Sequence, residues 1–167
     1  IANVGQMAAS DVVIADVLPA GVAFVTNSAR ALTSGYAIGQ PAVSGGTLTW
    51  SAANGNALTK TGLPAGELPA RSGDVVIQYK GVVDSSVLSG THLPNRVTVG
   101  TVTPEDGFEP NEDEAAVDTP HPDPVIFKNG PAFVQSGERF DWTVTYYNAT
   151  RQAGENVYII DSLPDAD

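Results

Sequence analysis

Residues 3–19 read NVGQMAASDVVIADVLP, and residues 148–164 read NATRQAGENVYIIDSLP. The two stretches align without a gap at a constant offset of 145 residues (148 − 3 = 145). Self-similarity at a fixed period is the sequence signature of a tandem array. We therefore expect one full period of such an array in shifted phase, opening and closing inside a repeat. The positions that coincide are Asn3/Asn148, Ala8/Ala153, Val12/Val157, Ile14/Ile159, Asp16/Asp161, Leu18/Leu163 and Pro19/Pro164.

Composition limits the classes of protein to which the chain can belong. It has 167 residues, a formal net charge of −11 and no cysteine. Nucleic acid is excluded as a partner, because its binding rests on clustered Lys and Arg and only eight of these residues are present. Disulfides, thiolate metal sites and thiol catalysis are excluded by the missing cysteine. No stretch reaches the roughly 18 apolar residues of a spanning helix, so we expect no membrane span in this segment.

The hydrophobic pattern is that of β-strands. Phe140, Trp142, Val144 and Tyr146 alternate with polar residues, as a half-buried antiparallel strand requires. Many short strands separated by Gly and Pro turns predict an all-β fold, an immunoglobulin-like antiparallel β-sandwich. Further strands are predicted at 11–17, 22–26, 46–51, 75–83, 96–103, 114–118, 124–128 and 156–162, with tight turns at Gly45-Gly46 and Asn54-Gly55. The predicted core comprises Trp50, Trp142, Tyr79, Ile77, Val75, Val12, Ile14, Val97 and Val99.

Residues 104–123 differ in character from the rest. They hold eight of the nineteen acidic residues, several prolines, and no Lys or Arg. We place the boundary between the two copies near 119–122, where proline stiffens the connection. The predicted domains are residues 1–120, a sandwich repeat that lacks its first strands, and residues 121–167, the first strands of the next repeat.

Several short motifs recur in a characteristic order. They are Leu-Pro-Ala-Gly-Val-x-Phe-Val at 18–25, Gly-Gly-Thr-Leu-Thr-Trp at 45–50, Leu-Pro-Ala-Gly at 63–66, Leu-Pro-Asn-Arg-Val-x-Val at 93–99, Pro-Val-Ile-Phe-Lys at 124–128, Ser-Gly-Glu at 136–138 and Trp-x-Val-x-Tyr-x-Asn at 142–148. In this order they resemble the immunoglobulin-like surface repeat of prokaryotes catalogued as domain of unknown function eleven. Such repeats are similar to stalk modules of large adhesins and cell-wall proteins. The resemblance implies a structural role at the extracellular cell surface, with neighbouring repeats or other copies of the chain as partners.

The resemblance also implies a candidate crosslink. In several surface-protein folds of immunoglobulin type, a Lys on the first strand condenses with an Asn on a late strand, and a buried carboxylate assists by shuttling the proton. The candidate isopeptide set here is Lys128, Asp16, Asp161 and Asn95, and no copy holds a complete set within this chain. The chemistry needs burial, which favours the neutral amine. The alternative is a solvated strand-edge lysine with turn-forming Asp and Asn.

Calcium is a second candidate ligand. Asp106, Glu109, Asn111 and Asp113 offer carboxylate and amide oxygens close to the predicted boundary, where an ion would stiffen a rod of stacked domains. Their spacing does not match an EF-hand loop. The alternative is a solvated acidic linker without a bound ion.

Catalysis has little support in the sequence. His92 and His121 are the only histidines, and neither lies in a nucleophile-elbow or zinc-protease motif. We therefore expect no enzyme but a spacer or self-assembling module of a bacterial surface, adhesin or filament protein. The alternative is a binding module that recognises a carbohydrate, host protein or matrix ligand through loops 27–40 and 54–60, where Tyr36 is the single aromatic residue.

The phase of the repeat allows one more expectation. Residues 123–165 of one molecule could complete residues 1–120 of the next, because an unfinished sandwich leaves an unpaired edge that accepts a strand from outside. Donation would bring Lys128 toward Asp16 and Asn95, and would propagate head to tail into a filament. The alternative is that the flanking repeats of one long chain supply the missing strands.

Overall fold

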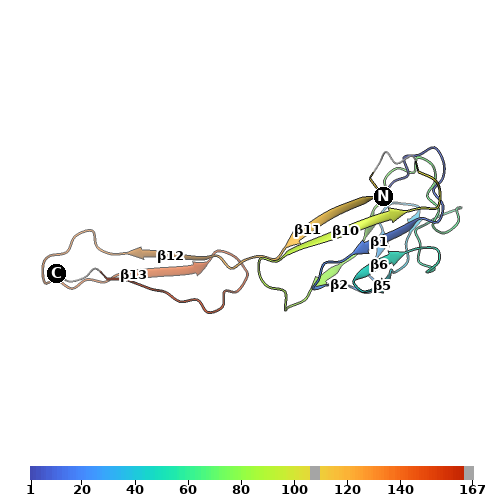
Figure 1. Cartoon of the computed structure of the whole chain (residues 1–167). Helices are drawn as coiled ribbons and strands as arrows, with labels where there is room; N and C mark the ends of the chain where they lie inside the picture. Colours follow the sequence, from blue (N-terminus) through green and yellow to red (C-terminus); the bar gives the residue numbers. More distant parts are fainter. Residues whose placement is uncertain (106–109, 164–167) are drawn as a thin grey trace. The chain divides into compact units, whose positions relative to one another are not determined.

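The structure is a computed structural model that describes residues 1–105 and 110–163. It divides into two compact units. Unit 1 comprises Ile1–Leu88 and His92–Asp118, and unit 2 comprises Ser89–Thr91 and Thr119–Asp167. Within the described residues there are strands and turns but no helix, and every strand pair is antiparallel (Figure 1). The prediction of an all-β, antiparallel fold is confirmed.

A five-stranded sheet organises unit 1. Its order is β11-β10-β1-β6-β5, so β1 lies in the middle with a partner on each edge (Figure 1). Its neighbours β10 and β6 are far apart in sequence, so long-range pairing fixes the sheet. The strands are β1 (Val13–Val17), β5 (Ala42–Ser44), β6 (Thr47–Trp50), β10 (His92–Gly100) and β11 (Glu112–Asp118).

Three short strand pairs complete unit 1. β2 (Val22–Phe24) pairs with β9 (Gly81–Val83), β3 (Arg30–Ala31) with β8 (Ile77–Gln78), and β4 (Tyr36–Ala37) with β7 (Thr59–Lys60). Gly45 and Gly46 form the turn between β5 and β6, with φ angles of 56° and 82°. A tight hairpin turn requires such positive φ angles, and glycine adopts them without strain. The turn predicted there is confirmed.

The core of unit 1 gathers around Trp50 and Leu48, which are almost completely buried. The indole N–H of Trp50 donates to the carbonyl of Gly39 at 2.9 Å, so the one polar group of this buried side chain is paired. The predicted core residues Val12, Ile14, Trp50 and Val75 are buried as expected. The predicted Ile77, Tyr79, Val97 and Val99 are only half-buried and pack against that cluster.

Unit 2 contains a single two-stranded sheet. β12 (Pro124–Asn129) pairs with β13 (Thr143–Asn148), with Lys128 opposite Val144. Trp142 is 47% exposed, so its prediction as a core residue was wrong. The physical reason is that no second layer covers this sheet within the described part of unit 2.

A second correction concerns residues 156–162, which were predicted as a strand but form none. Their repeat equivalent, 11–17, includes β1, which is held by β10 and β6. The two segments share a sequence pattern and differ in their partners.

In the described residues, no helix has the length and apolar character needed to cross a membrane.

We expect Trp50→Ala to lower the free energy of unfolding of unit 1 by about 3 to 5 kcal/mol, the usual result of emptying a fully packed aromatic site. Urea unfolding followed by circular dichroism measures this. Val43→Ala is the control, since Val43 is 57% exposed on β5 and its truncation should change stability by less than about 0.5 kcal/mol. Equal effects of the two changes would contradict the core assignment.

Candidate functional site

A carboxylate lies inside the core of unit 1. Side chains of a strand point alternately to its two faces, and on β1 this places Ile14 and Asp16 on the same buried face, 4% and 5% exposed. An ionised carboxylate in such a place is costly unless it is paired or hydrogen-bonded. The surroundings of Asp16 therefore decide how unit 1 tolerates it.

Two side chains from other strand segments approach Asp16. Tyr79, between β8 and β9, donates its hydroxyl hydrogen to Asp16 Oδ2 at 2.8 Å. Asn95 on β10 donates from Nδ2 to the Tyr79 hydroxyl oxygen at 3.2 Å. The Oδ1 atoms of Asp16 and Asn95 are buried and have no hydrogen-bond partner among the described residues. The cluster thus holds two acceptor oxygens that lack a donor.

The electrostatics of the cluster follow from its burial. Burial raises the pKa of Asp16 above its ordinary value of 3.8, and hydrogen bonds from Tyr79 and Asn95 act in the opposite direction. Burial also raises the pKa of Tyr79, and the hydrogen bond to Asp16 and the charge of that carboxylate add to the effect. Tyr79 therefore stays a neutral donor, and burial disfavours the ionised form of Asp16, which a nearby cation would stabilise.

A related pair occurs in unit 2. Lys128 on β12 places Nζ 2.5 Å from Asp161 Oδ1 and 4.6 Å from the centre of the Trp142 ring. A lysine over a tryptophan face is held by a cation–π interaction as well as by the ion pair. Asp161 occupies the position equivalent to Asp16 in the 145-residue repeat. In unit 2 this aspartate therefore has a cationic partner, whereas its equivalent in unit 1 forms no ion pair within the described residues.

The four residues predicted as an isopeptide set fall into two pairs. Asp16 and Asn95 meet through Tyr79 in unit 1, and Lys128 meets Asp161 in unit 2. The sequence predicted Tyr79 only as a core residue. The alternation of Tyr79 with Val75 and Ile77 indicated that its ring is buried. A buried tyrosine hydroxyl usually has a hydrogen-bond partner, so this pattern could have suggested a polar contact for Tyr79.

The residues predicted to bind calcium are only partly described. Asp106 and Glu109 lie outside the described residues. Asn111 donates from Nδ2 to Glu105 Oε2 at 2.5 Å, and Asp113 Oδ1 accepts the backbone N–H of Glu114 at 2.9 Å. No group of three or more acidic or histidine side chains gathers in the part of the chain that the structure describes. The calcium site stays a prediction.

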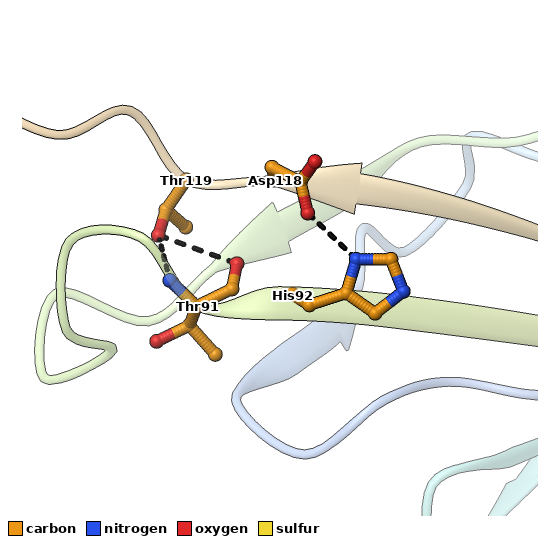
Figure 2. A network of polar contacts seen from close by, with 4 residues as sticks. All are labelled: Thr91, His92, Asp118 and Thr119. Atoms are coloured by element: carbon orange, nitrogen blue, oxygen red, sulfur yellow. Dashed lines mark hydrogen bonds and ion pairs between the residues drawn. The ribbon is translucent and has the colours of Figure 1, made fainter.

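The two histidines lie in different units, His92 at the start of β10 in unit 1 and His121 in unit 2. His92 Nδ1 is 2.7 Å from Asp118 Oδ1, and both side chains are exposed (Figure 2). In unit 2, the backbone N–H of Thr91 donates to the Thr119 hydroxyl at 2.8 Å (Figure 2). The carbonyl of His121 accepts a hydrogen bond from the Thr150 hydroxyl at 2.8 Å. The contact between His92 and Asp118 joins the paired ends of β10 and β11 within unit 1.

Comparison with protein-family models, with curated proteins and with solved structures finds no match to this chain. The resemblance to prokaryotic surface repeats therefore stays a prediction.

We expect Asp16→Asn to gain stability relative to the wild type as the pH rises from acid to neutral. The pKa of Asp16 is raised in the folded state, so the stability that its neutral form contributes is complete below pH 3.8 and is lost as the pH rises through the raised pKa. The amide of the variant stays neutral throughout. Urea unfolding at a series of pH values measures the difference.

Asp74→Asn serves as the matched control for that series, because it makes the same change on an exposed side chain of unit 1. If the stability difference between Asp16→Asn and wild type did not depend on pH, the burial of an ionisable group at Asp16 would be contradicted.

Proposed function

We propose that this chain is a structural repeat module of an extracellular surface, adhesin or filament protein, and that it acts as a spacer or in self-assembly by strand complementation. On this proposal, unit 1 has the fold of an immunoglobulin-like sandwich. In support, Trp50 of the five-stranded sheet and Phe24 of β2 each lie 6.0 Å, between ring centres, from Tyr79, so the sheet and the small strand pairs share one core. The extracellular location rests on the resemblance of the motifs.

One observation carries the proposal, an unpaired strand edge in unit 1. Val75 exchanges two backbone hydrogen bonds with Ile1, at 2.7 and 2.8 Å. The backbone carbonyls of Val76 and Lys80 accept from Leu32 and Val25 on the opposite edge, at 2.8 and 2.9 Å. Backbone groups of a strand alternate between its two edges, so the odd-numbered residues 77, 79 and 81 face the same edge as Val75.

Beyond Val75, no strand pairs with this edge among the described residues. Unpaired N–H and C=O groups in a row are a template for pairing with another chain. Extended segments add to such edges through main-chain hydrogen bonds, and their side chains supply specificity.

Unit 2 has the complementary defect. A two-stranded sheet is marginal by itself, and β12–β13 leaves large apolar side chains uncovered. Phe140 is 42% exposed and Ile126 is 54% exposed. Docking this sheet onto a second molecule of the chain would remove its apolar surface from water, which is the main driving force for association. On this proposal the edge of unit 1 acts as the acceptor and the sheet of unit 2 of another molecule acts as the donor.

A covalent joint is the stronger form of this proposal. Lys128 Nζ of one copy would attack Cγ of Asn95 in another, an amide C–N bond would form, and the side-chain nitrogen of Asn95 would leave as ammonia. Asp16 would take the proton from the amine and pass it to the leaving group. The bound pair would be lighter than two chains by one ammonia.

The alternative of a binding module gains no support from the loops. Tyr36, their single aromatic residue, is half-buried, and Lys60 lies over its ring at 5.0 Å. An aromatic side chain covered in this way offers little surface to a carbohydrate or a host protein.

We expect the 167-residue chain to self-associate with rising concentration, because strand addition is bimolecular. Sedimentation velocity over a wide concentration range measures the growth of dimers and longer species. Intact-mass analysis of the same samples after denaturation shows whether a joint has lost ammonia. A folded monomer at every concentration would overturn strand complementation, and association with only unmodified monomer masses would overturn the covalent form.

A further inference from the structure

We infer that the outward face around Arg30 and Lys80 of unit 1 is a docking surface for the acidic strand β11 of a second copy of this chain. The contact uses the outward faces of strands and not a strand edge. It is therefore independent of the strand complementation proposed above.

The first surface lies on the strand segments that pair as β3–β8 and β2–β9. Val75 is buried in the core cluster, and Ile77 and Tyr79 pack against it. Strand side chains alternate between two faces, so the even-numbered residues of this segment point away from the core. The exposed residues that form this surface, which we call the cationic face, are Arg30, Leu32, Val76, Gln78, Lys80 and Val82.

Arg30 is held in place by a neighbour on the cationic face. Its guanidinium donates from Nε and Nη2 to Gln78 Oε1, at 3.0 and 2.5 Å, and the two residues lie opposite each other in the β3–β8 pair. A guanidinium has five N–H donors, so three remain available to an anion. A side chain that is already fixed loses less conformational entropy when it binds a partner.

Lys80 lies two residues beyond Gln78 on the same face. Its backbone is fixed on both sides, because its carbonyl accepts from the N–H of Val25 at 2.9 Å and its own N–H donates to Ser28 Oγ at 3.0 Å. Diagonal neighbours in an antiparallel pair lie about 7 to 8 Å apart. The guanidinium of Arg30 and the ammonium of Lys80 can therefore contact one acidic segment together.

Arg30 and Lys80 form no ion pair within the described residues, although the chain has 19 acidic residues and only eight Lys and Arg. The nearest carboxylates along the strand are at its two ends. Asp74 is four residues from Gln78 and Asp84 is four residues from Lys80, which is about 13 Å in each case. This separation exceeds the Debye length of about 8 Å at physiological ionic strength, so these carboxylates neutralise the face only weakly.

The second surface is the outward face of β10 and β11. Leu93 is buried, and Val97 and Val99 pack against the core cluster, so the even-numbered residues of β10 and their partners on β11 point away from the core. With histidine neutral, three carboxylates and one arginine give this face a formal charge of −2, against +2 for the cationic face. The charged residues of this acidic face are Glu112, Glu114, Asp118, Arg96 and His92.

Glu114 is the carboxylate most available to a partner. Arg96 lies directly opposite it, but the Arg96 guanidinium forms its ion pair with Glu112. Glu114 has no ion pair in the part of the chain that the structure describes. Glu112 and Glu114 are two residues apart on β11, which is about 7 Å. Their separation is close to that of Arg30 and Lys80, so the two faces match in spacing as well as in charge.

One unit cannot bring these two faces together, because both point away from the same core. Tyr79 beneath the cationic face and Val97 beneath the acidic face pack against one cluster. The partner is therefore a second copy, and the contact is heterologous, so each added chain presents one further face of each kind. The contact would also remove from water the apolar side chains beside the cations, since Leu32 is 51% exposed and Val82 is 54% exposed.

A charge-swap experiment tests the docking surface. One variant carries Arg30→Glu and Lys80→Glu, and the other carries Glu112→Lys and Glu114→Lys. Each variant alone should self-associate about tenfold more weakly than wild type at about 0.1 M salt, because attraction between the faces becomes repulsion. A mixture of the two again offers faces of opposite charge, and sedimentation velocity should show the wild-type affinity in it.

The net charges of the variants make restoration specific to the faces. They are −15 and −7 (−11 − 4 and −11 + 4), so whole molecules of the two variants repel each other. Restored association also shows that both variants fold. The matched control carries Lys60→Glu and Arg71→Glu, which gives the same net charge of −15 by changing two cations of unit 1 outside the cationic face. It should associate as wild type does, and a loss equal to that of the Arg30→Glu, Lys80→Glu variant would overturn the proposal.

Salt distinguishes this contact from strand complementation. Raising the salt concentration from about 0.1 to about 1 M shortens the Debye length from about 10 to about 3 Å, so association through the two faces should weaken. Strand pairing depends on main-chain hydrogen bonds and apolar surface and should persist. Self-association that neither charge-reversed variant changes would overturn the docking surface and leave strand complementation standing.

A heparin column tests a polyanion as the other occupant of the cationic face. If wild type were retained on heparin through Arg30 and Lys80 while the charge-reversed variants self-associated unchanged, the second copy would be overturned as the occupant. A wild type that stays monomeric at every concentration would overturn the contact as well.

Discussion

β1 is a strand because β10 and β6 hold both of its edges. Ile14 lies opposite Val99 on one side and opposite Trp50 on the other, so its backbone and its side chain are both enclosed. Residues 156–162 carry the same alternation and form no strand in the described part of unit 2. Strand formation here depends on what pairs with a segment more than on its local pattern. Among the described residues, 156–162 have no strand partners comparable to β10 and β6.

The sequence could predict which segments alternate but not which segments meet. Alternation and turn glycines are local properties, and they located β1, β6, β12 and β13 to within a few residues. The sheet order β11-β10-β1-β6-β5 depends on pairings between distant segments, which no local pattern contains. Trp142 shows the same limit. Its alternation correctly marks an apolar face, but whether a face is buried depends on a second layer.

The sequence identified the four residues of the candidate site by their chemistry, but it did not show which of them are in contact. A lysine, two aspartates and an asparagine in strand contexts could be listed from the sequence alone. Their grouping could not, because Tyr79 contacts Asp16 across 63 residues and Lys128 contacts Asp161 across 33. Tyr79 joins the two residues of unit 1, and its place in line with Val75 and Ile77 indicated a core side chain without indicating its partners. A buried hydroxyl becomes informative only when its partner is known.

A carboxyl group inside a core also restricts how that core can be rearranged. Slipping a strand by one residue turns all its side chains to the opposite face. A one-residue slip of β1 would turn Asp16 away from Tyr79 and leave the Tyr79 hydroxyl in the core without its acceptor. An apolar residue at Asp16 would carry no such penalty. The carboxyl group therefore favours one register of β1, and specificity of this kind arises from penalising the alternatives.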